Sequence, residues 1–152
     1  MRRFLTGLGL AAALSIAAAG CSDKSTPTPP SAAIDLTGRW SGDVSVLGMT
    51  ARMTWTLTQS NGTVTGPVIL GPASGTVLLN GTLTGALTGS TLTYTIAVAP
   101  GNIPSQPSCA GQIAGTMTVS IGPPSSMTGP SAVTGSNCTP PFPGGTITLN
   151  KQ

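Results

Sequence analysis

The stretch that decides the fold class is residues 91–98, with the sequence TLTYTIAV. Every second residue is apolar, and the residues between them are threonine or alanine. The apolar set is Leu92, Tyr94, Ile96 and Val98. Because successive side chains of a β-strand point to opposite faces, this period of two predicts a strand with one buried and one solvent-exposed face. Threonine forms strands well and tolerates water, which suits it to the exposed face.

The same alternation recurs from Asp35 to the C-terminus, and turn-forming residues divide this region into segments of ordinary strand length. The predicted strands are residues 38–47, 50–59, 63–70, 77–87, 91–99, 111–121, 126–136 and 145–150. Asn61-Gly62 is a strong signal for a type I′ hairpin. A second tight hairpin at Asn80-Gly81 would divide the fourth strand and give nine strands in place of eight.

The composition argues against a helical bundle. The chain has 152 residues, of which 6% are charged and 3% aromatic, with 21 glycines and 14 prolines. This length suits one domain. A helical bundle needs Ala, Glu, Lys and Leu at helical period, and no segment after residue 21 has that period.

Eight short antiparallel strands joined by consecutive hairpins suit an all-β, up-and-down β-barrel or a β-sandwich. The start of the first strand, Gly38-Arg39-Trp40, resembles the G-x-W motif of the lipocalins. In that family a basic side chain from the last strand lies across the tryptophan and closes one end of the barrel. The resemblance implies that Lys151 closes the barrel over Trp40. A lipocalin-like barrel over residues 35–152 is therefore the prediction, and a β-sandwich is the alternative.

An eight-stranded barrel is filled by its own side chains or holds one small ligand. The inward-facing candidates for lining the interior are Trp40, Met53, Trp55, Leu57, Tyr94, Ile96 and Met117. None of them carries a charge, so a ligand would have to be apolar. Inward glycines, such as Gly42 and Gly66, either leave space or relieve strain where strands bend. We expect the second, and a filled core.

The first twenty-one residues are typical of an export signal. Two arginines precede an uncharged, mostly apolar stretch over residues 4–19, which is too short for a comfortable membrane span. The sequence AAGC at residues 18–21 resembles the lipobox of bacterial lipoproteins. That resemblance implies a signal peptide over residues 1–20, cleavage before Cys21, and acyl chains such as palmitate on Cys21. Cleavage at an ordinary secretory site is the alternative.

Residues 22–34, SDKSTPTPPSAAI, are predicted to form a disordered tether, because proline and small polar residues favour an extended chain and cannot bury a core. Without residues 1–20 the side chains carry a net charge of +1, too little to hold nucleic acid or anionic lipid. Membrane attachment must then come from acyl chains. By resemblance to lipoprotein sorting rules, Ser22 implies the outer membrane, so we expect a cell-envelope location.

The two remaining cysteines are predicted to form a disulfide. Export places Cys109 and Cys138 in an oxidising compartment. Their midpoint falls on the predicted turn at Pro123-Pro124, which puts them opposite each other at the open ends of one hairpin. A β-bulge would reconcile this register with the alternation of faces.

The sequence offers no candidate catalytic residue, metal site or cofactor site. Acid–base catalysis needs a group that titrates near the working pH, and the chain has no histidine and no glutamate. Its three aspartates all precede residue 44. Two thiols without histidine do not suggest a metal site. We therefore expect a non-enzymatic protein without a cofactor.

Two functions stay open at this point. The first is a monomeric, lipid-anchored structural or interaction module that contacts envelope protein or polysaccharide. The second is a lipocalin-like carrier of a small apolar ligand inside the barrel. Segments such as LTGRWSG (36–42) and GGTITL (144–149) resemble small, mostly uncharacterised Thr/Gly-rich bacterial lipoproteins with a calycin-like barrel, and that resemblance implies no specific activity.

Overall fold

The computed structural model describes residues 33–46, 49–72, 75–139 and 144–152. The predicted signal peptide, the acylated Cys21 and the tether up to residue 32 lie outside the described residues. The described part contains eight strands. They are β1 (Gly38–Val46), β2 (Met49–Ser60), β3 (Thr63–Gly71), β4 (Leu79–Thr88), β5 (Thr91–Val98), β6 (Gly111–Ser120), β7 (Ser126–Ser136) and β8 (Gly145–Lys151).

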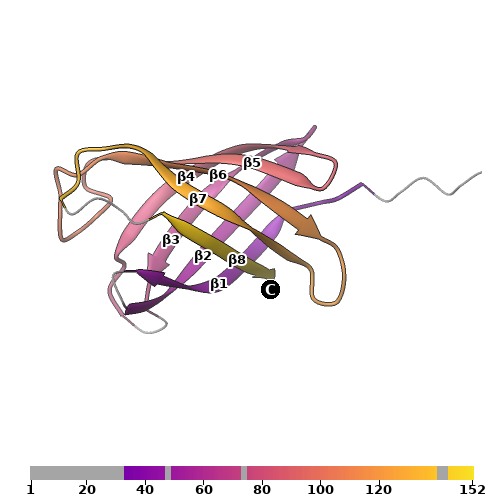
Figure 1. The fold of residues 1–152 in the computed structure, drawn as a ribbon, viewed down its shortest axis with the longest axis horizontal. Coiled ribbons are helices and arrows are strands. Elements are labelled where there is room, and N and C mark those ends of the chain that lie inside the picture. Colours follow the sequence, from indigo (N-terminus) through magenta and orange to yellow (C-terminus); the bar gives the residue numbers. More distant parts are fainter. Residues whose placement is uncertain (1–32, 47–48, 73–74, 140–143) are drawn as a thin grey trace, which may run out of the picture. The chain divides into compact units, whose positions relative to one another are not determined.

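The strands form a closed barrel in which each strand pairs antiparallel with its neighbour in sequence and β8 pairs with β1 (Figure 1). The predicted all-β, up-and-down barrel is confirmed, and the β-sandwich is excluded. Every strand boundary lies within two residues of its predicted position. Asn80 and Gly81 lie inside β4, so the described chain has eight strands and not nine.

The β2–β3 turn follows its prediction. Asn61 has a φ of 48° and Gly62 a φ of 79°. A type I′ turn needs positive φ at both central residues, and its twist matches that of the two strands it joins. The predicted type I′ hairpin is therefore confirmed, and it fixes the register of β2 against β3.

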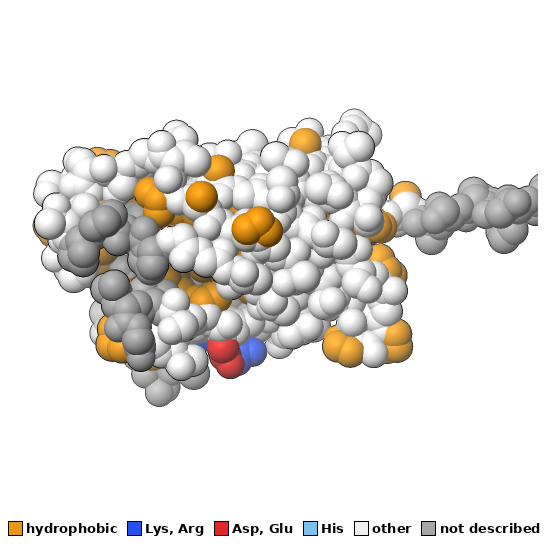
Figure 2. All heavy atoms as spheres, in the orientation of Figure 1, with side chains coloured by type: hydrophobic (Ala, Val, Ile, Leu, Met, Phe, Trp, Pro, Cys, Tyr) orange, Lys and Arg blue, Asp and Glu red, His pale blue; other side chains and the backbone are white. Residues whose placement is uncertain are grey.

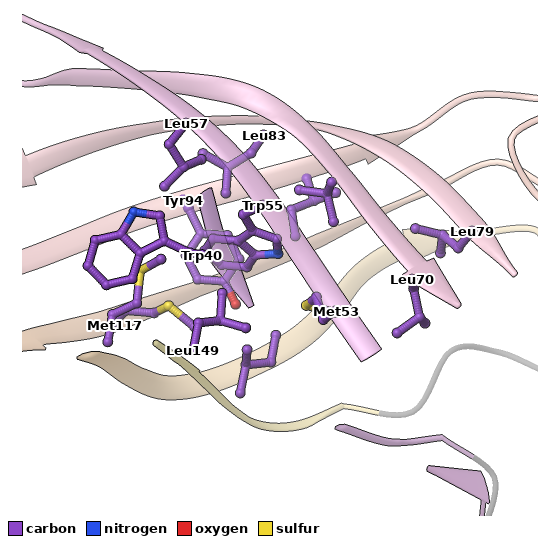
Figure 3. Close-up of a cluster of buried hydrophobic side chains, with 14 of the residues drawn as sticks. Trp40, Met53, Trp55, Leu57, Leu70, Leu79, Leu83, Tyr94, Met117 and Leu149 are labelled. Atoms are coloured by element: carbon purple, nitrogen blue, oxygen red, sulfur yellow. The ribbon is translucent and has the colours of Figure 1, made fainter. Parts of the chain in front are cut away.

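The interior of the barrel is an apolar core. Buried and exposed residues alternate along β5 as the threonine-rich sequence predicts. Trp55 and Tyr94 meet edge to face near the middle, with ring centroids 5.0 Å apart (Figure 3). Each fully buried large apolar side chain contributes about 1.5–3 kcal/mol. The largest of them are Trp40, Trp55, Tyr94, Leu36, Leu57, Leu83, Leu92, Ile96, Met117, Met127, Leu149 and Val64.

Three inward glycines allow neighbouring strands to approach closely. A Cβ on Gly42 would overlap the carbonyl oxygen of Thr148 in β8. A Cβ on Gly66 in β3 would overlap the Thr56 carbonyl oxygen, and one on Gly129 in β7 would overlap that of Thr116. The obstacles are backbone atoms, which cannot rotate away. These glycines therefore mark close contacts between strands and leave no empty space.

The predicted disulfide between Cys109 and Cys138 is present, with the two Cα atoms 4.8 Å apart. Cys109 precedes β6 and Cys138 follows β7, so the bond ties together the open ends of this hairpin. The register shifts between Gln112 and Ile113, where β7 contains the extra residue Thr134. This irregularity is a β-bulge in the hairpin that carries the two cysteines, as the cysteine spacing suggested.

Candidate functional site

One end of the barrel is capped by the chain that leads into β1. We call this the capped end; the tight β2–β3 and β4–β5 turns lie on the same side. Leu36 is fully buried, and its carbonyl oxygen accepts a 2.8 Å hydrogen bond from Trp40 Nε1. Gln59 holds the same segment: its Oε1 accepts from the Leu36 N–H and its Nε2 donates to the Ile34 carbonyl, both at 2.9 Å. The interior is therefore closed to solvent at this end.

Lys151 lies over the capped end. Its Nζ is 5.5 Å from the centroid of the Trp40 ring and donates a 3.1 Å hydrogen bond to the Asp35 carbonyl oxygen. The two residues are also opposite each other in the β1–β8 ladder. Hydrogen bonds from the Thr37 side chain and backbone N–H hold the pKa of the Asp35 carboxyl below its usual value, and the charge of Lys151 adds to the effect. The structure thus brings together the two residues of the expected barrel closure.

The opposite end of the barrel contains a cavity of about 70 Å³, and we call this the cavity end. Its walls are apolar side chains from six strands, together with Gly144, the first residues of β8 and Ser131. The lining residues are Val44, Ser45, Met53, Val68, Leu70, Leu79, Ile96, Ile113, Ser131, Gly144, Gly145, Thr146 and Ile147. None of these described lining residues is charged.

The cavity lies where β1 and β8 separate. Their ladder contains two residue pairs, Trp40 with Lys151 and Ser41 with Asn150. Beyond these pairs, towards the cavity end, Val44 and Ser45 of β1 line the cavity, as do Gly144 and residues 145–147 of β8, and the two sides do not pair with each other. Since every other neighbouring pair of strands has at least six residue pairs, this seam is the weakest part of the barrel wall.

Two buried polar atoms belong to residues that do not line this cavity. Trp55 Nε1 and the Tyr94 hydroxyl are both buried, and neither has a hydrogen-bond partner among the described residues. Met53 and Ile96, each two residues farther along the same strand faces, line the cavity. In Figure 3 the Trp55 nitrogen points to the side on which Met53, Leu70 and Leu79 lie.

The phenol of Tyr94 stays neutral at physiological pH. Burial raises the pKa of Tyr94 to about 12, against a smaller lowering by the nearby Ser131 hydroxyl. That hydroxyl donates to the Gly145 carbonyl oxygen at 3.0 Å, and its oxygen still has lone pairs that can accept from the Tyr94 hydroxyl. Tyr94 is therefore a neutral phenol that lies near the Ser131 hydroxyl.

The seven residues predicted to line the interior all point inward and are buried, but they divide into two groups. Met53 and Ile96 line the cavity. The other five, Trp40, Trp55, Leu57, Tyr94 and Met117, fill the barrel between the cavity and the capped end. Ser131 and the β8 residues of the cavity wall are not among the predicted lining residues, because alternation predicts the face of a residue and not its depth.

The outer face of the barrel carries threonines in rows that cross the strands. Threonines lie directly opposite one another from strand to strand, and Thr128 and Thr148 share a 2.7 Å hydrogen bond between their hydroxyls. One row, from β2 to β5, consists of Thr58, Thr65, Thr84 and Thr95. The other, the long threonine row from β4 to β8, consists of Thr88, Thr91, Thr118, Thr128 and Thr148.

Charge is sparse on this surface. The face shown in Figure 2 is mostly uncharged, and acidic and basic side-chain atoms appear on it in one small cluster. Arg52 lies 3.6 Å from Asp43 and donates a 3.0 Å hydrogen bond to the Ser41 hydroxyl. Arg52 also lines a hollow of about 160 Å³ with Arg39 on the outside of β1–β3. Because the ion pair is largely exposed, it contributes little to stability.

Within the described ranges, no three His, Cys, Asp or Glu side chains come together as a possible metal site. The same part of the chain has no helix long and apolar enough to cross a membrane. Comparison of the chain with protein-family models, curated proteins and solved structures found no match.

Proposed function

We propose that this protein is a lipid-anchored, non-enzymatic module of the cell envelope, whose barrel surface binds an uncharged envelope polysaccharide. The observation that carries the proposal is the long threonine row from β4 to β8. Neighbouring strands are about 4.8 Å apart, so the row presents hydroxyls at a regular short interval across five strands. A polymer with many hydroxyl and amide groups can form repeated hydrogen bonds along such a row.

The sparse charge of the barrel supports an uncharged partner. The described residues include only five charged side chains: Asp35, Arg39, Asp43, Arg52 and Lys151. Lys151 lies over Trp40, and Arg52 is close to Asp43. Long-range attraction to a polyanion needs a surplus of one sign, which this surface lacks. Affinity must then come from many weak hydrogen bonds and from contacts with the threonine methyl groups.

The exposed apolar residues of the described part offer no aromatic anchor for a protein partner. Protein interfaces are enriched in Tyr, Trp and Phe, and such residues dominate their binding energy. Both tryptophans and the single tyrosine are buried. The large apolar side chains exposed among the described residues are Met49, Ile69, Leu78 and Ile121. They come from separate strands and loops, and they do not include an aromatic residue.

Co-sedimentation of the purified full chain with isolated cell-wall polysaccharide tests the proposed contact. The test variant is Thr91→Val, Thr118→Val, Thr128→Val, which removes three hydroxyls of the long threonine row while keeping side-chain shape. The control variant is Thr56→Val, Thr63→Val, Thr82→Val, whose exposed threonines face other residue types across the ladder. At about 0.5–1.5 kcal/mol per hydrogen bond, we expect at least a tenfold loss of affinity for the test variant alone.

Equal binding by both variants would contradict the role of the threonine row. Absence of sedimentation, together with capture of one defined envelope protein whose binding the test variant weakens, would replace polysaccharide by protein as the partner.

The proposed anchor has a separate test. Mass spectrometry of the N-terminal peptide from detergent-extracted protein should detect a chain that begins at acylated Cys21. Cys21→Ser should move the protein from the detergent phase to the aqueous phase. An unmodified N-terminus at another residue would contradict lipid anchoring.

A further inference from the structure

A hollow of about 160 Å³ lies on the outside of the barrel, over β1, β2 and β3. Two of the residues that line it are arginines from neighbouring strands, Arg39 of β1 and Arg52 of β2. The described part of the chain has one further cation, Lys151, which lies over the capped end. Two of the three described cations are therefore concentrated at one hollow.

The strand register directs the two guanidinium groups towards the same place. Arg52 reaches across to β1, where it donates a 3.0 Å hydrogen bond to the Ser41 hydroxyl. Ser41 lies opposite Thr54, and Arg39 is related to Thr54 by the same diagonal that relates Ser41 to Arg52. Such diagonal neighbours are within reach of long side chains. Since Thr54 also lines the hollow, the two arginines approach the Ser41–Thr54 pair from opposite sides.

Both arginines keep hydrogen-bond donors that the described residues do not use. A guanidinium carries five N–H donors in a planar fork. No side-chain hydrogen bond or ion pair joins Arg39 to another residue in the described ranges. Arg52 uses one N–H on Ser41, and its Nη1 lies 3.6 Å from the Asp43 carboxylate, beyond ordinary hydrogen-bond length. Asp43 does not line the hollow, and one local positive charge remains even when Asp43 is counted.

The rest of the hollow is largely apolar. Ile69 of β3 is 43% exposed, and Pro72 and Val77 line the hollow beside it. An exposed apolar wall next to two cations suits a molecule that has an apolar body and an anionic end. A cavity of about 150 Å³ can hold benzene, so a volume of about 160 Å³ suits one six-membered ring.

We propose that this hollow binds a small organic anion, a carboxylate on a six-membered ring, whose charged group accepts hydrogen bonds from Arg39 and Arg52. The ring packs against Ile69, Pro72 and Val77. Arginine forks bind carboxylates through two parallel hydrogen bonds, which are stronger than those between neutral groups. A neutral molecule of the same shape loses this charge assistance, and an inorganic anion leaves the apolar wall uncovered.

Titration with benzoate, benzamide and inorganic phosphate tests the proposal. Benzamide has the ring of benzoate without its charge, and phosphate has the charge without the ring. The probes are added at low ionic strength to the full chain carrying Cys21→Ser, which keeps the whole barrel and removes the proposed acylation site. The readout is the backbone amide signals of Thr54 and Ile69, which line the hollow. We expect benzoate to shift both signals saturably, with an affinity about tenfold higher than that of either other probe.

Three variants separate the arginine fork from net charge. Arg39→Gln removes the charge and the fork from an exposed residue, and it should weaken benzoate binding about tenfold. Arg39→Lys keeps the charge and loses the fork, so its affinity should lie between these two values. Lys151→Gln removes one positive charge outside the hollow lining, and it should leave the benzoate affinity unchanged.

Equal weakening by Arg39→Gln and Lys151→Gln would mean that net charge alone attracts the anion, and it would overturn the proposal. A phosphate affinity equal to that of benzoate, or the absence of a saturable shift, would also overturn it. The long threonine row lies on β4 to β8, and its test variant leaves every lining residue of the hollow intact. The surface contact proposed above and this anion site can therefore fail separately.

Discussion

Substitution of Gly42 by alanine should open the seam between β1 and β8. An alanine Cβ at this position would overlap the Thr148 carbonyl oxygen, and it would lie 3.0 Å from the Thr148 carbonyl carbon and 3.3 Å from Leu149 Cα. All three are backbone atoms of β8. Relief therefore requires the two strands to move apart, and no side-chain rotation can replace that movement.

The cost follows from what holds these strands together. Overpacking of this kind costs about 1–3 kcal/mol. Separation also weakens a ladder of two residue pairs, in which each hydrogen bond contributes about 1 kcal/mol. We expect Gly42→Ala to lower the free energy of unfolding by about 2–4 kcal/mol.

Urea unfolding followed by tryptophan fluorescence measures this loss. Gly135→Ala is the matched control, because a Cβ there has no atom within 4 Å. It should be neutral or stabilising by up to about 1 kcal/mol, since alanine restricts the unfolded chain. If Gly42→Ala unfolded at the same urea concentration as the control, β1 and β8 would not be in contact at this position.

Three further predictions concern the disulfide, the capped end and Tyr94. Reduction of Cys109–Cys138, with a separation of 29 residues, should lower the free energy of unfolding by about 3–4 kcal/mol. Urea curves with and without reductant test this, and a loss below about 1 kcal/mol would contradict it. Lys151→Met should lower the free energy of unfolding by about 1 kcal/mol, because it removes the contact with Asp35 and the charge over Trp40. Lys151→Arg keeps the charge and should lower it less. Equal stability of both variants and the unmodified protein would argue against a role for this charge. Tyr94 is the only tyrosine, so phenolate absorbance should titrate near pH 12 in the folded protein and near pH 10 in urea. Because the folded-state pKa is the higher one, this group's contribution to stability is fully present below pH 10 and is lost as the pH rises through 12. Tyr94→Phe should lack that loss, and a folded-state midpoint near pH 10 would mean that the phenol is solvated.

The strands were predictable because local residues determine them. Thr91–Val98 alternates without interruption, and Asn61-Gly62 specifies its own turn. The disulfide was predictable for a related reason: two cysteines at equal distances from one turn must face each other in a hairpin. Such features need only the period of a strand and the position of a turn.

The cap and the cavity could not be predicted in this way. Gln59 holds Ile34 and Leu36 through contacts more than twenty residues apart in sequence, and no local pattern indicates them. Tyr94 and Ile96 have the same parity, but one lies in the filled region and the other lines the cavity. Depth in a barrel depends on strand stagger, on the bulge at Gln112/Ile113 and on glycine contacts, which appear only when the sheet closes.

The central claim is that β8 returns to β1 and closes a barrel around the apolar core. The most direct measurement is the set of nuclear Overhauser contacts between backbone protons of Trp40 and Lys151 and of Ser41 and Asn150, in uniformly labelled protein. We predict contacts for both pairs. Their absence, with β8 paired to β7 alone, would mean an open sheet and would contradict the closed interior on which the cap, the cavity and the outer threonine rows depend.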